Sequence, residues 1–281
     1  MRNSGTSWRI LSSDDAIVNQ LAGALNLNKT ASRLLVQRGI SSVEEVRKFL
    51  DPRLDHLHNP LRLTDLGLAM DRLMRAIHGG EPIVVHGDYD VDGITSTVIL
   101  QRVLELLGGN VSHYIPNRLT DGYGLRPETI DRFADQGHRV IVTVDCGITA
   151  FDEVDYAKSV SVDVIITDHH LPHNGVPNAV ASLNPKIPGG NYPFLDLCGA
   201  GLGFKLIQGL FEFYGQPWDP GLLELAALGT IADLVPLLDE NRYLVREGLK
   251  GLANTRRPGL RALYSSARVE ADEITAETVT F

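Results

Sequence analysis

From Pro82 onward, short apolar runs rich in β-branched residues alternate with longer segments of helical pattern. The runs expected as strands cover residues 83–85, 111–115, 139–144, 162–167 and 179–183. Helices are expected at 94–107, 127–136, about 150–159, 199–214 and 222–228. Such alternation is typical of right-handed βαβ units. We therefore predict an α/β fold in which a mostly parallel sheet is flanked by helices on both faces.

The residues before this alternation have a helical pattern from about residue 12 to residue 80. A serine at position 41 or 42 is a good N-cap, and a glutamate at 44 or 45 can complete a capping box. A further amphipathic helix is expected at 66–78, ended by two glycines. Two short helices around a glycine turn could indicate a DNA-binding helix-turn-helix, but the two glutamates would then face phosphates. A helical region packed on the following domain is the preferred interpretation.

The overall composition is that of an ordinary globular protein. The 281 residues, 43% of them hydrophobic, suffice for one large or two small domains. No apolar run is long enough to span a bilayer, and residues 1–8 lack the apolar core of a signal peptide. The two cysteines, Cys146 and Cys198, cannot form a disulfide framework. We expect a cytoplasmic protein that does not bind membranes.

The formal net charge of −9 argues against a broad basic surface for nucleic acid. The charge does not exclude such a substrate, because aspartates that hold metal ions count as negative in the sequence but face cations in the folded site.

An acidic turn follows the first expected strand. Potential metal ligands occupy every second position before helix-forming residues begin at Ile94, namely His86, Asp88, Asp90 and Asp92. Carboxylates this close repel one another unless a cation neutralises them, and oxygen and imidazole ligands suit Mn²⁺, Mg²⁺ or Zn²⁺. The turn also matches the opening of a calcium-binding EF-hand. That interpretation fails because Ile99 stands where the bidentate glutamate belongs, and because a strand precedes the turn.

Other acidic and histidine residues fall where later elements end. Asp145 follows the third strand, Asp168, His169 and His170 follow the fourth, and Asp233 interrupts an otherwise apolar segment. Each has a structural interpretation by itself, as a helix cap, a solvated turn or a helix-end polar residue. Their joint placement favours one metal centre at the carboxyl edge of the sheet. The number of ligands suits two ions that share a carboxylate, an arrangement used to hydrolyse phosphoesters or phosphoanhydrides.

The same residues match four motifs of the DHH phosphoesterases, a family named for the triplet at residues 168–170. The motifs appear in order at residues 86–93, 144–147, 167–170 and 229–233. Within the family, the segment 115–125 resembles the RecJ group of single-strand-specific exonucleases. The resemblance implies 5′-to-3′ degradation of single-stranded DNA to mononucleotides in recombination and repair, dependent on two Mn²⁺ or Mg²⁺ ions. It also implies single-strand-binding protein and a recombination helicase as partners.

The resemblance further implies residue roles. His86, Asp90 and Asp145 would hold one ion, and Asp92, Asp145, His169 and Asp233 the other. His170 would neutralise the scissile phosphate or assist the leaving oxygen, and Asp168 would orient a histidine. Asp88 would be catalytic or would hold the loop. Asn117 and Arg118 would contact the DNA backbone, and Tyr123 would stack on a base or sugar.

The domain prediction combines these patterns with the resemblance. It places a helical N-terminal region at 1–80, the DHH catalytic domain at 81–250, and at 251–281 the start of a segment that connects to a missing second domain. Two alternatives stay open at this level: a DHH phosphoesterase for short oligonucleotides, cyclic dinucleotides or pyrophosphate, and an inactive DHH-type scaffold.

Overall fold

The computed structural model describes residue 9, residues 11–270 and residues 273–280 of the chain. Residues 1–8, where the sequence has no signal-peptide pattern, lie outside the described residues. Contacts divide the chain into two compact units, one that ends at His56 and one that begins at Leu57. The domain boundary predicted at residue 80 stays a prediction.

The first unit is helical. Its elements are α1 (Asp15–Leu25), α2 (Lys29–Gln37), α3 (Val43–Leu50) and a short 3-10 turn, η1 (Leu54–His56). The capping box is formed by Ser42 and Glu45, because Glu45 N donates to Ser42 Oγ at 3.1 Å and Ser42 N donates to Glu45 Oε2 at 2.9 Å. These backbone donors hold the pKa of Glu45 below its usual value. The capping box expected at the start of this helix is therefore confirmed.

The second unit begins with η2 (Pro60–Arg62) and α4 (Leu66–Gly79). The helix predicted at 66–78 is confirmed, and it ends because Gly80 adopts a left-handed conformation with φ 66°. Its buried face, which includes Ala69 and Leu73, belongs to the main hydrophobic core.

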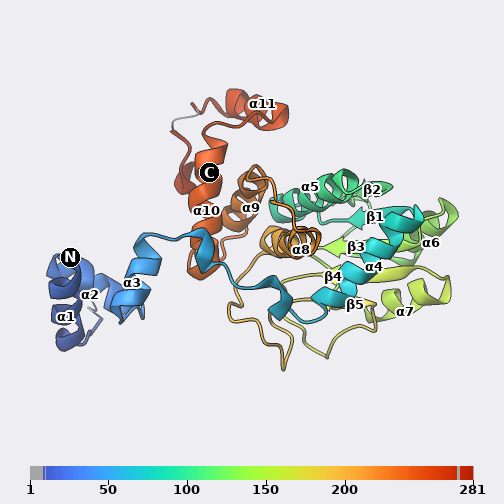
Figure 1. Ribbon diagram of the computed structural model, residues 1–281. Helices are drawn as coiled ribbons and strands as arrows, with labels where there is room; N and C mark the ends of the chain where they lie inside the picture. Colours follow the sequence, from blue (N-terminus) through green and yellow to red (C-terminus); the bar gives the residue numbers. More distant parts are fainter. Residues whose placement is uncertain (1–8, 10, 271–272, 281) are drawn as a thin grey trace, which may run out of the picture. The chain divides into compact units, whose positions relative to one another are not determined.

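In the described residues, five strands form a single sheet in the order β2-β1-β3-β4-β5 (Figure 1). They are β1 (Ile83–His86), β2 (Val111–Tyr114), β3 (Val140–Val144), β4 (Asp163–Thr167) and β5 (Ala181–Leu183). Every neighbouring pair is parallel. The predicted parallel sheet is therefore confirmed, with the ends of each strand close to those of its expected range.

Alternate residues of the central strands face two different cores. Val85 and Val142 pack in the core that includes α4, α5 and α8, whereas Val84 and Ile141 pack in the core that includes α6 and α7. The remaining helices are α5 (Val91–Leu106), α6 (Pro127–Asp135), α7 (Phe151–Ser159), α8 (Gly199–Tyr214), α9 (Leu222–Ala232), α10 (Asp239–Leu252), α11 (Pro258–Ala267) and α12 (Ala276–Thr280). Because strand side chains alternate in direction, apolar residues at every position require helices on both faces.

Two helices differ from their expected bounds. Helix α5 starts at Val91, before the expected Ile94, because the Asp90 side chain accepts a hydrogen bond from Gly93 N at 2.9 Å and caps the helix. Helix α9 continues past the expected Leu228 to Ala232. As a result, Asp92 lies in the first turn of a helix rather than in a loop, and Asp233 is a helix C-cap.

The strand order reverses direction between β1 and β3. The chain passes outward from β1 to β2 and then returns to the other side of β1 to form β3, β4 and β5. In open α/β sheets, the loops on either side of such a reversal diverge and leave a crevice at the carboxyl ends of the strands. The acidic turn follows β1 and Asp145 follows β3, the two strands between which the order reverses.

A buried ion pair ties α8 to α10 inside the second unit. Lys205 Nζ donates to Glu240 Oε1 at 2.8 Å, to Gln208 Oε1 at 2.7 Å and to the carbonyl oxygen of His58 at 2.5 Å. The other Glu240 oxygen accepts from the Tyr192 hydroxyl at 2.5 Å. Lys205 and Glu240 are both completely buried. All three ammonium donors are thus used, which is the condition under which a buried charge is tolerated.

Candidate metal centre

Carboxylate and imidazole side chains from separate segments meet beyond the carboxyl ends of β1, β3 and β4. Among the described residues, three groups have ligand atoms within 4.8 Å of one another: Asp88, Asp90 and Asp145; Asp145, His169 and His170; and Asp92, His169 and Asp233. Asp145 and His169 each belong to two groups, so the three groups adjoin. The convergence expected from the strand ends is therefore observed.

Asp145 lies at the centre of these groups. It follows β3 in a left-handed conformation with φ 61°, and its backbone N–H donates to Thr167 O at 2.9 Å. Its buried Oδ1 lies 3.1 Å from His169 Nε2 but has no hydrogen-bond partner among the described residues. Burial, with the nearby carboxylates of Asp92 and Asp90, raises the pKa of Asp145 to about 11. A bound cation would stabilise the ionised form of this buried carboxylate, which lies close to other carboxylates.

Asp92 connects the centre to the start of α8. Its Oδ2 accepts a hydrogen bond from Gly199 N at 2.5 Å and its Oδ1 accepts one from Ala200 N at 2.8 Å. Its Oδ2 also lies 3.9 Å from His169 Nε2. Burial raises the pKa of Asp92, whereas the two amides favour its ionised form. Gly199 and Ala200 were not expected from the sequence, and the available signal was the run of small residues at the start of this helix.

Gly199 leaves no room for a side chain beside the centre. A Cβ at this position would lie 2.8 Å from Asp145 Cβ and 2.9 Å from Asp92 Oδ2. We expect Gly199→Ala to weaken Mn²⁺ binding by about tenfold to a hundredfold, the range found when groups that support metal ligands are disturbed. Isothermal titration calorimetry measures this change.

Gly203 provides the matched control in the same helix. A Cβ there would meet its nearest neighbour, Leu100 Cγ, at 3.8 Å, which is an ordinary contact. We expect Gly203→Ala to leave Mn²⁺ binding unchanged. Equal affinities for the two variants would contradict a steric role for Gly199.

His169 and Asp233 complete the second side of the centre. His169 Nε2 lies 3.6 Å from Asp233 Oδ2, and neither ring nitrogen of His169 has a hydrogen-bond partner among the described residues. Burial lowers the pKa of His169 and raises that of Asp233. The imidazole is thus neutral near pH 7, which is the form that binds metal ions.

Asp168 holds His170 in a fixed orientation. His170 Nδ1 lies 2.7 Å from Asp168 Oδ1, which also accepts a hydrogen bond from His170 N at 3.0 Å. The second oxygen of Asp168 accepts from Ile148 N at 2.9 Å. The hydrogen bond to Asp168 raises the pKa of His170. The other ring nitrogen of His170, Nε2, can therefore carry a proton on a half-exposed imidazole at the edge of the centre.

The remaining residues of the acidic turn occupy different positions. Asp88 is buried, its Oδ1 accepts from Tyr89 N at 2.7 Å, and it lies in one group with Asp90 and Asp145. His86 is completely buried and belongs to none of the three groups of described residues, although the sequence predicts it as a ligand beside Asp90 and Asp145. In the structure, Asp88 is grouped with Asp90 and Asp145, the two residues beside which the sequence predicts His86. The assignment of either residue to an ion stays a prediction.

Burial of His86 predicts a loss of stability in acid for the metal-free protein. Desolvation lowers the pKa of His86 to about 4 from its ordinary value of 6.5. As the pH falls, His86 therefore takes up a proton in the unfolded chain before it does so in the folded chain. The free energy of unfolding accordingly decreases between pH 6.5 and about 4. The loss from this residue is roughly 3 kcal/mol.

Urea unfolding at pH 7 and pH 4.5 checks the effect of His86. We expect the difference in unfolding free energy between these pH values to shrink in His86→Gln, because glutamine takes up no proton. His113→Gln, at an exposed position, is the control and should keep the wild-type difference. An unchanged difference in His86→Gln would contradict the prediction.

The predicted substrate contacts lie on the loop after β2. The Tyr123 hydroxyl donates to the carbonyl oxygen of Asp145 at 3.1 Å, and its ring centroid lies 6.4 Å from that of His170. The Arg118 guanidinium lies over the Tyr89 ring at 5.3 Å. Asn117 Oδ1 instead accepts from the backbone of Leu119 and stabilises the turn. Tyr123 thus contacts Asp145 and His170, and Arg118 contacts Tyr89 in the acidic turn. The side-chain oxygen of Asn117 instead stabilises the loop.

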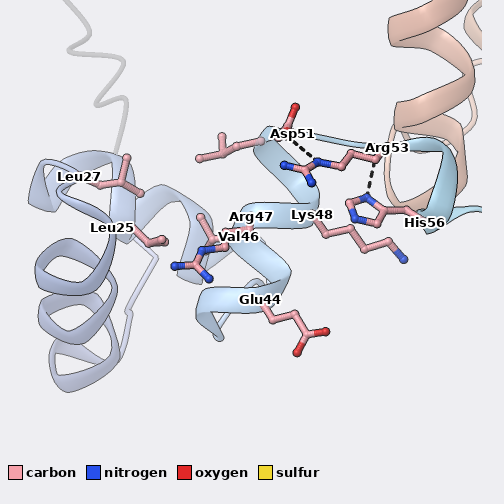
Figure 2. Close-up of a pocket in the computed structure, with 10 residues that line it drawn as sticks. Leu25, Leu27, Glu44, Val46, Arg47, Lys48, Asp51, Arg53 and His56 are labelled. Atoms are coloured by element: carbon pink, nitrogen blue, oxygen red, sulfur yellow. Dashed lines mark hydrogen bonds and ion pairs between the residues drawn. The ribbon is translucent and has the colours of Figure 1, made fainter.

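A pocket of about 690 Å³ lies in the first unit, between the end of α1 and α3 (Figure 2). Leucines and a valine line it together with charged residues, and Asp51 is already paired with Arg53 at 2.9 Å. Arg53 N also donates to His56 Nδ1. The three groups of potential metal ligands found among the described residues all lie in the second unit. This pocket is therefore not the predicted metal site.

Comparison with known proteins decides the family. The sequence model of the DHH family, N-terminal domain, matches residues 82–230, more than half of the chain, and this range contains every residue of the three groups except Asp233. The chain belongs to the DHH family.

Two curated relatives align over most of this chain. It is 40% identical over 274 residues to the single-stranded-DNA-specific exonuclease RecJ of Bacillus subtilis, covering 98% of this chain and 34% of that protein. It is 37% identical to the RecJ of Escherichia coli, covering 89% of this chain and 45% of that protein. The chain therefore spans between about a third and a half of the length of these relatives.

Solved structures of DHH proteins share the fold. The crystal structure of RecJ from Thermus thermophilus in complex with Mn²⁺ superposes with a TM-score of 0.81 at 34% identity, covering 98% of this chain and 39% of that one. The same protein in complex with Mg²⁺ gives a TM-score of 0.70 at 32% identity, covering 98% of this chain and 35% of that one. Within the described residues, none of the helices combines the length and apolar character needed to cross a membrane.

Proposed function

We propose that this chain is the catalytic region of a metal-dependent exonuclease that degrades single-stranded DNA from the 5′ end and releases mononucleotides. The observation that carries the proposal is the convergence of carboxylates and imidazoles around Asp145 at the carboxyl edge of the sheet. The relatives that are named single-stranded-DNA-specific exonucleases support the choice of substrate. The reaction is the hydrolysis of a phosphodiester bond.

The donor set fits two divalent ions such as Mn²⁺ or Mg²⁺. Buried ligand atoms of Asp145 and His169 have no hydrogen-bond partner among the described residues, and oxygen-rich sites suit these ions. Asp90, Asp145 and either Asp88 or His86 would hold one ion. The other would be held by Asp92, Asp145, His169 and Asp233. When bound, the ions supply Lewis acidity that activates water and screens the negative charge of the phosphoryl oxygens.

Residues around the centre would orient the substrate. His170, oriented by Asp168, presents a proton at Nε2 and would neutralise the scissile phosphate or protonate the leaving oxygen. The Arg118 guanidinium would bind a backbone phosphate, and the Tyr123 ring, which is half exposed, would contact a base or sugar. Asn117 would act through the shape of the loop that carries them.

The proposal extends to the setting of the reaction. We place the protein in the cytoplasm, in recombination and repair, where a single-strand-binding protein and a recombination helicase would supply the unpaired strand. Two cysteines that are both buried free thiols support a reducing compartment.

Labelled strands test the function. With Mn²⁺, a long single strand that carries a 5′ label is expected to release labelled mononucleotide at once, while a 3′-labelled strand shortens gradually. A blunt duplex of the same sequence is expected to resist. A dinucleotide consumed in place of the long strand would identify a small-substrate phosphoesterase. Mn²⁺ binding without hydrolysis of either substrate would identify an inactive scaffold.

A further inference from the structure

Three exposed apolar residues directly follow residues of the candidate metal centre in the sequence. Val91 follows Asp90, Leu171 follows His170, and Leu234 follows Asp233. Their exposed fractions are 46%, 58% and 74%. A single exposed leucine needs no explanation, but three exposed apolar residues, each bonded in the chain to a residue of the same polar site, favour a surface that another molecule covers.

Leu234 also has an unfavourable backbone conformation. It follows the C-cap of α9 with φ 57°, a left-handed conformation at a position where helices usually place glycine. Leucine at this position strains the backbone and exposes an apolar side chain, so neither property stabilises the fold. A strained residue beside a functional site is evidence for a role in that site.

We infer that Leu234, with Leu171 and Val91, forms an apolar contact surface for the unpaired bases of the substrate strand. This inference rests on the proposed function and names the part of the substrate that is recognised. The faces of bases are apolar and accessible in a single strand, whereas pairing and stacking cover them in a duplex. Contact with base faces tolerates any sequence, because every base has such a face. Leu234 is thus a residue that determines specificity for single strands, separate from the residues that hold the phosphate.

An abasic strand tests the inference, because it keeps the phosphodiester backbone and lacks the bases. The full chain with Mn²⁺ is titrated with an oligothymidylate strand and with an abasic strand of the same length, both made with phosphorothioate linkages that slow hydrolysis. We expect the wild type to bind the oligothymidylate more tightly. Leu234→Asn should weaken binding of the oligothymidylate by about fivefold to tenfold and leave binding of the abasic strand unchanged.

Two further variants separate recognition from folding. Leu234→Gly removes the strain, so its Tm should equal or exceed that of the wild type while its affinity for oligothymidylate falls. Leu106→Asn replaces a leucine that is 71% exposed at the last residue of α5, about 20 Å along the helix from Asp92. It should leave binding of both strands unchanged.

Each outcome decides between the two proposals. Equal binding of both strands by the wild type, or wild-type binding by Leu234→Asn, would overturn the base contact while leaving the phosphodiesterase function intact. The three exposed apolar residues would then be assigned to a contact with another protein. The protein could also bind the oligothymidylate more tightly than the abasic strand in the presence of Mn²⁺ but fail to hydrolyse an ordinary strand. That result would overturn the proposed function alone.

Discussion

Asp145→Asn is expected to remove the binding of two Mn²⁺ ions and to lower turnover about a thousandfold or more. Asp145 belongs to two of the three groups of candidate ligands, and we assign it to both ions, so the loss of its charge should affect both. Metal ions contribute several kcal/mol to catalysis of this kind, and each ~1.36 kcal/mol is a factor of ten in rate. Calorimetry with Mn²⁺ and cleavage of a 5′-labelled strand measure the two effects.

The same substitution should stabilise the metal-free protein. Burial raises the pKa of Asp145 to about 11 in the folded state, against an ordinary value of 3.8. The folded state therefore binds more protons than the unfolded state between these values, and stability falls as the pH rises through this range. Asparagine removes this dependence. We expect a higher Tm for metal-free Asp145→Asn and no further rise on addition of Mn²⁺, which should stabilise the wild type.

Asp152→Asn is the matched control, because Asp152 is exposed in the first turn of α7 and belongs to none of the described groups of ligands. It should keep wild-type affinity for Mn²⁺, turnover and Tm. If a variant of Asp145 still bound two Mn²⁺ ions, the assignment of Asp145 to both ions would be refuted.

Lys205→Met is expected to lower the free energy of unfolding by about 3–5 kcal/mol, the cost typical of breaking a buried ion pair. The substitution leaves the fully buried Glu240 without its ammonium partner. Burial lowers the pKa of Lys205, so the pair forms against a desolvation penalty. Urea unfolding measures the loss.

Two further variants identify the cause of the stability loss in Lys205→Met. In Lys205→Met with Glu240→Leu, no uncompensated charge remains, so much of the stability should return. Lys250→Met removes an exposed partner of Glu247 on α10 and should cost less than about 1 kcal/mol. A cost for Lys205→Met no larger than that for Lys250→Met would contradict the importance of the buried pair.

The fold was predictable because its signals are local and repeated. The β-branched runs alternate with helical segments, so the parallel sheet and its two helical layers follow from the sequence. Helix bounds were less certain where a side chain decides them. The sequence predicts Asp90 as a metal ligand. Its side chain also caps α5 through a local hydrogen bond, so the helix starts earlier than expected.

The convergence of the side chains at the candidate metal centre was predictable, but their individual contacts were not. Parallel strands bring Asp145 and the histidines after β4 to one edge, whatever their exact orientation. The position of Asp88 in the group expected for His86 depends on the turn conformation after β1. The contact between Asp92 and Gly199 joins residues that are 107 positions apart, so no local pattern reports it.

The candidate ligands of the centre are spread over the chain from Asp88 to Asp233, and each short stretch supplies only part of the set. A ribosome makes the chain from the N-terminus, so the acidic turn is complete long before its partners exist. We expect nascent chains that end before Asp233 to bind Mn²⁺ incompletely and to lack the proposed nuclease activity. The topology would thus delay a potentially harmful activity until almost the whole domain has been synthesised.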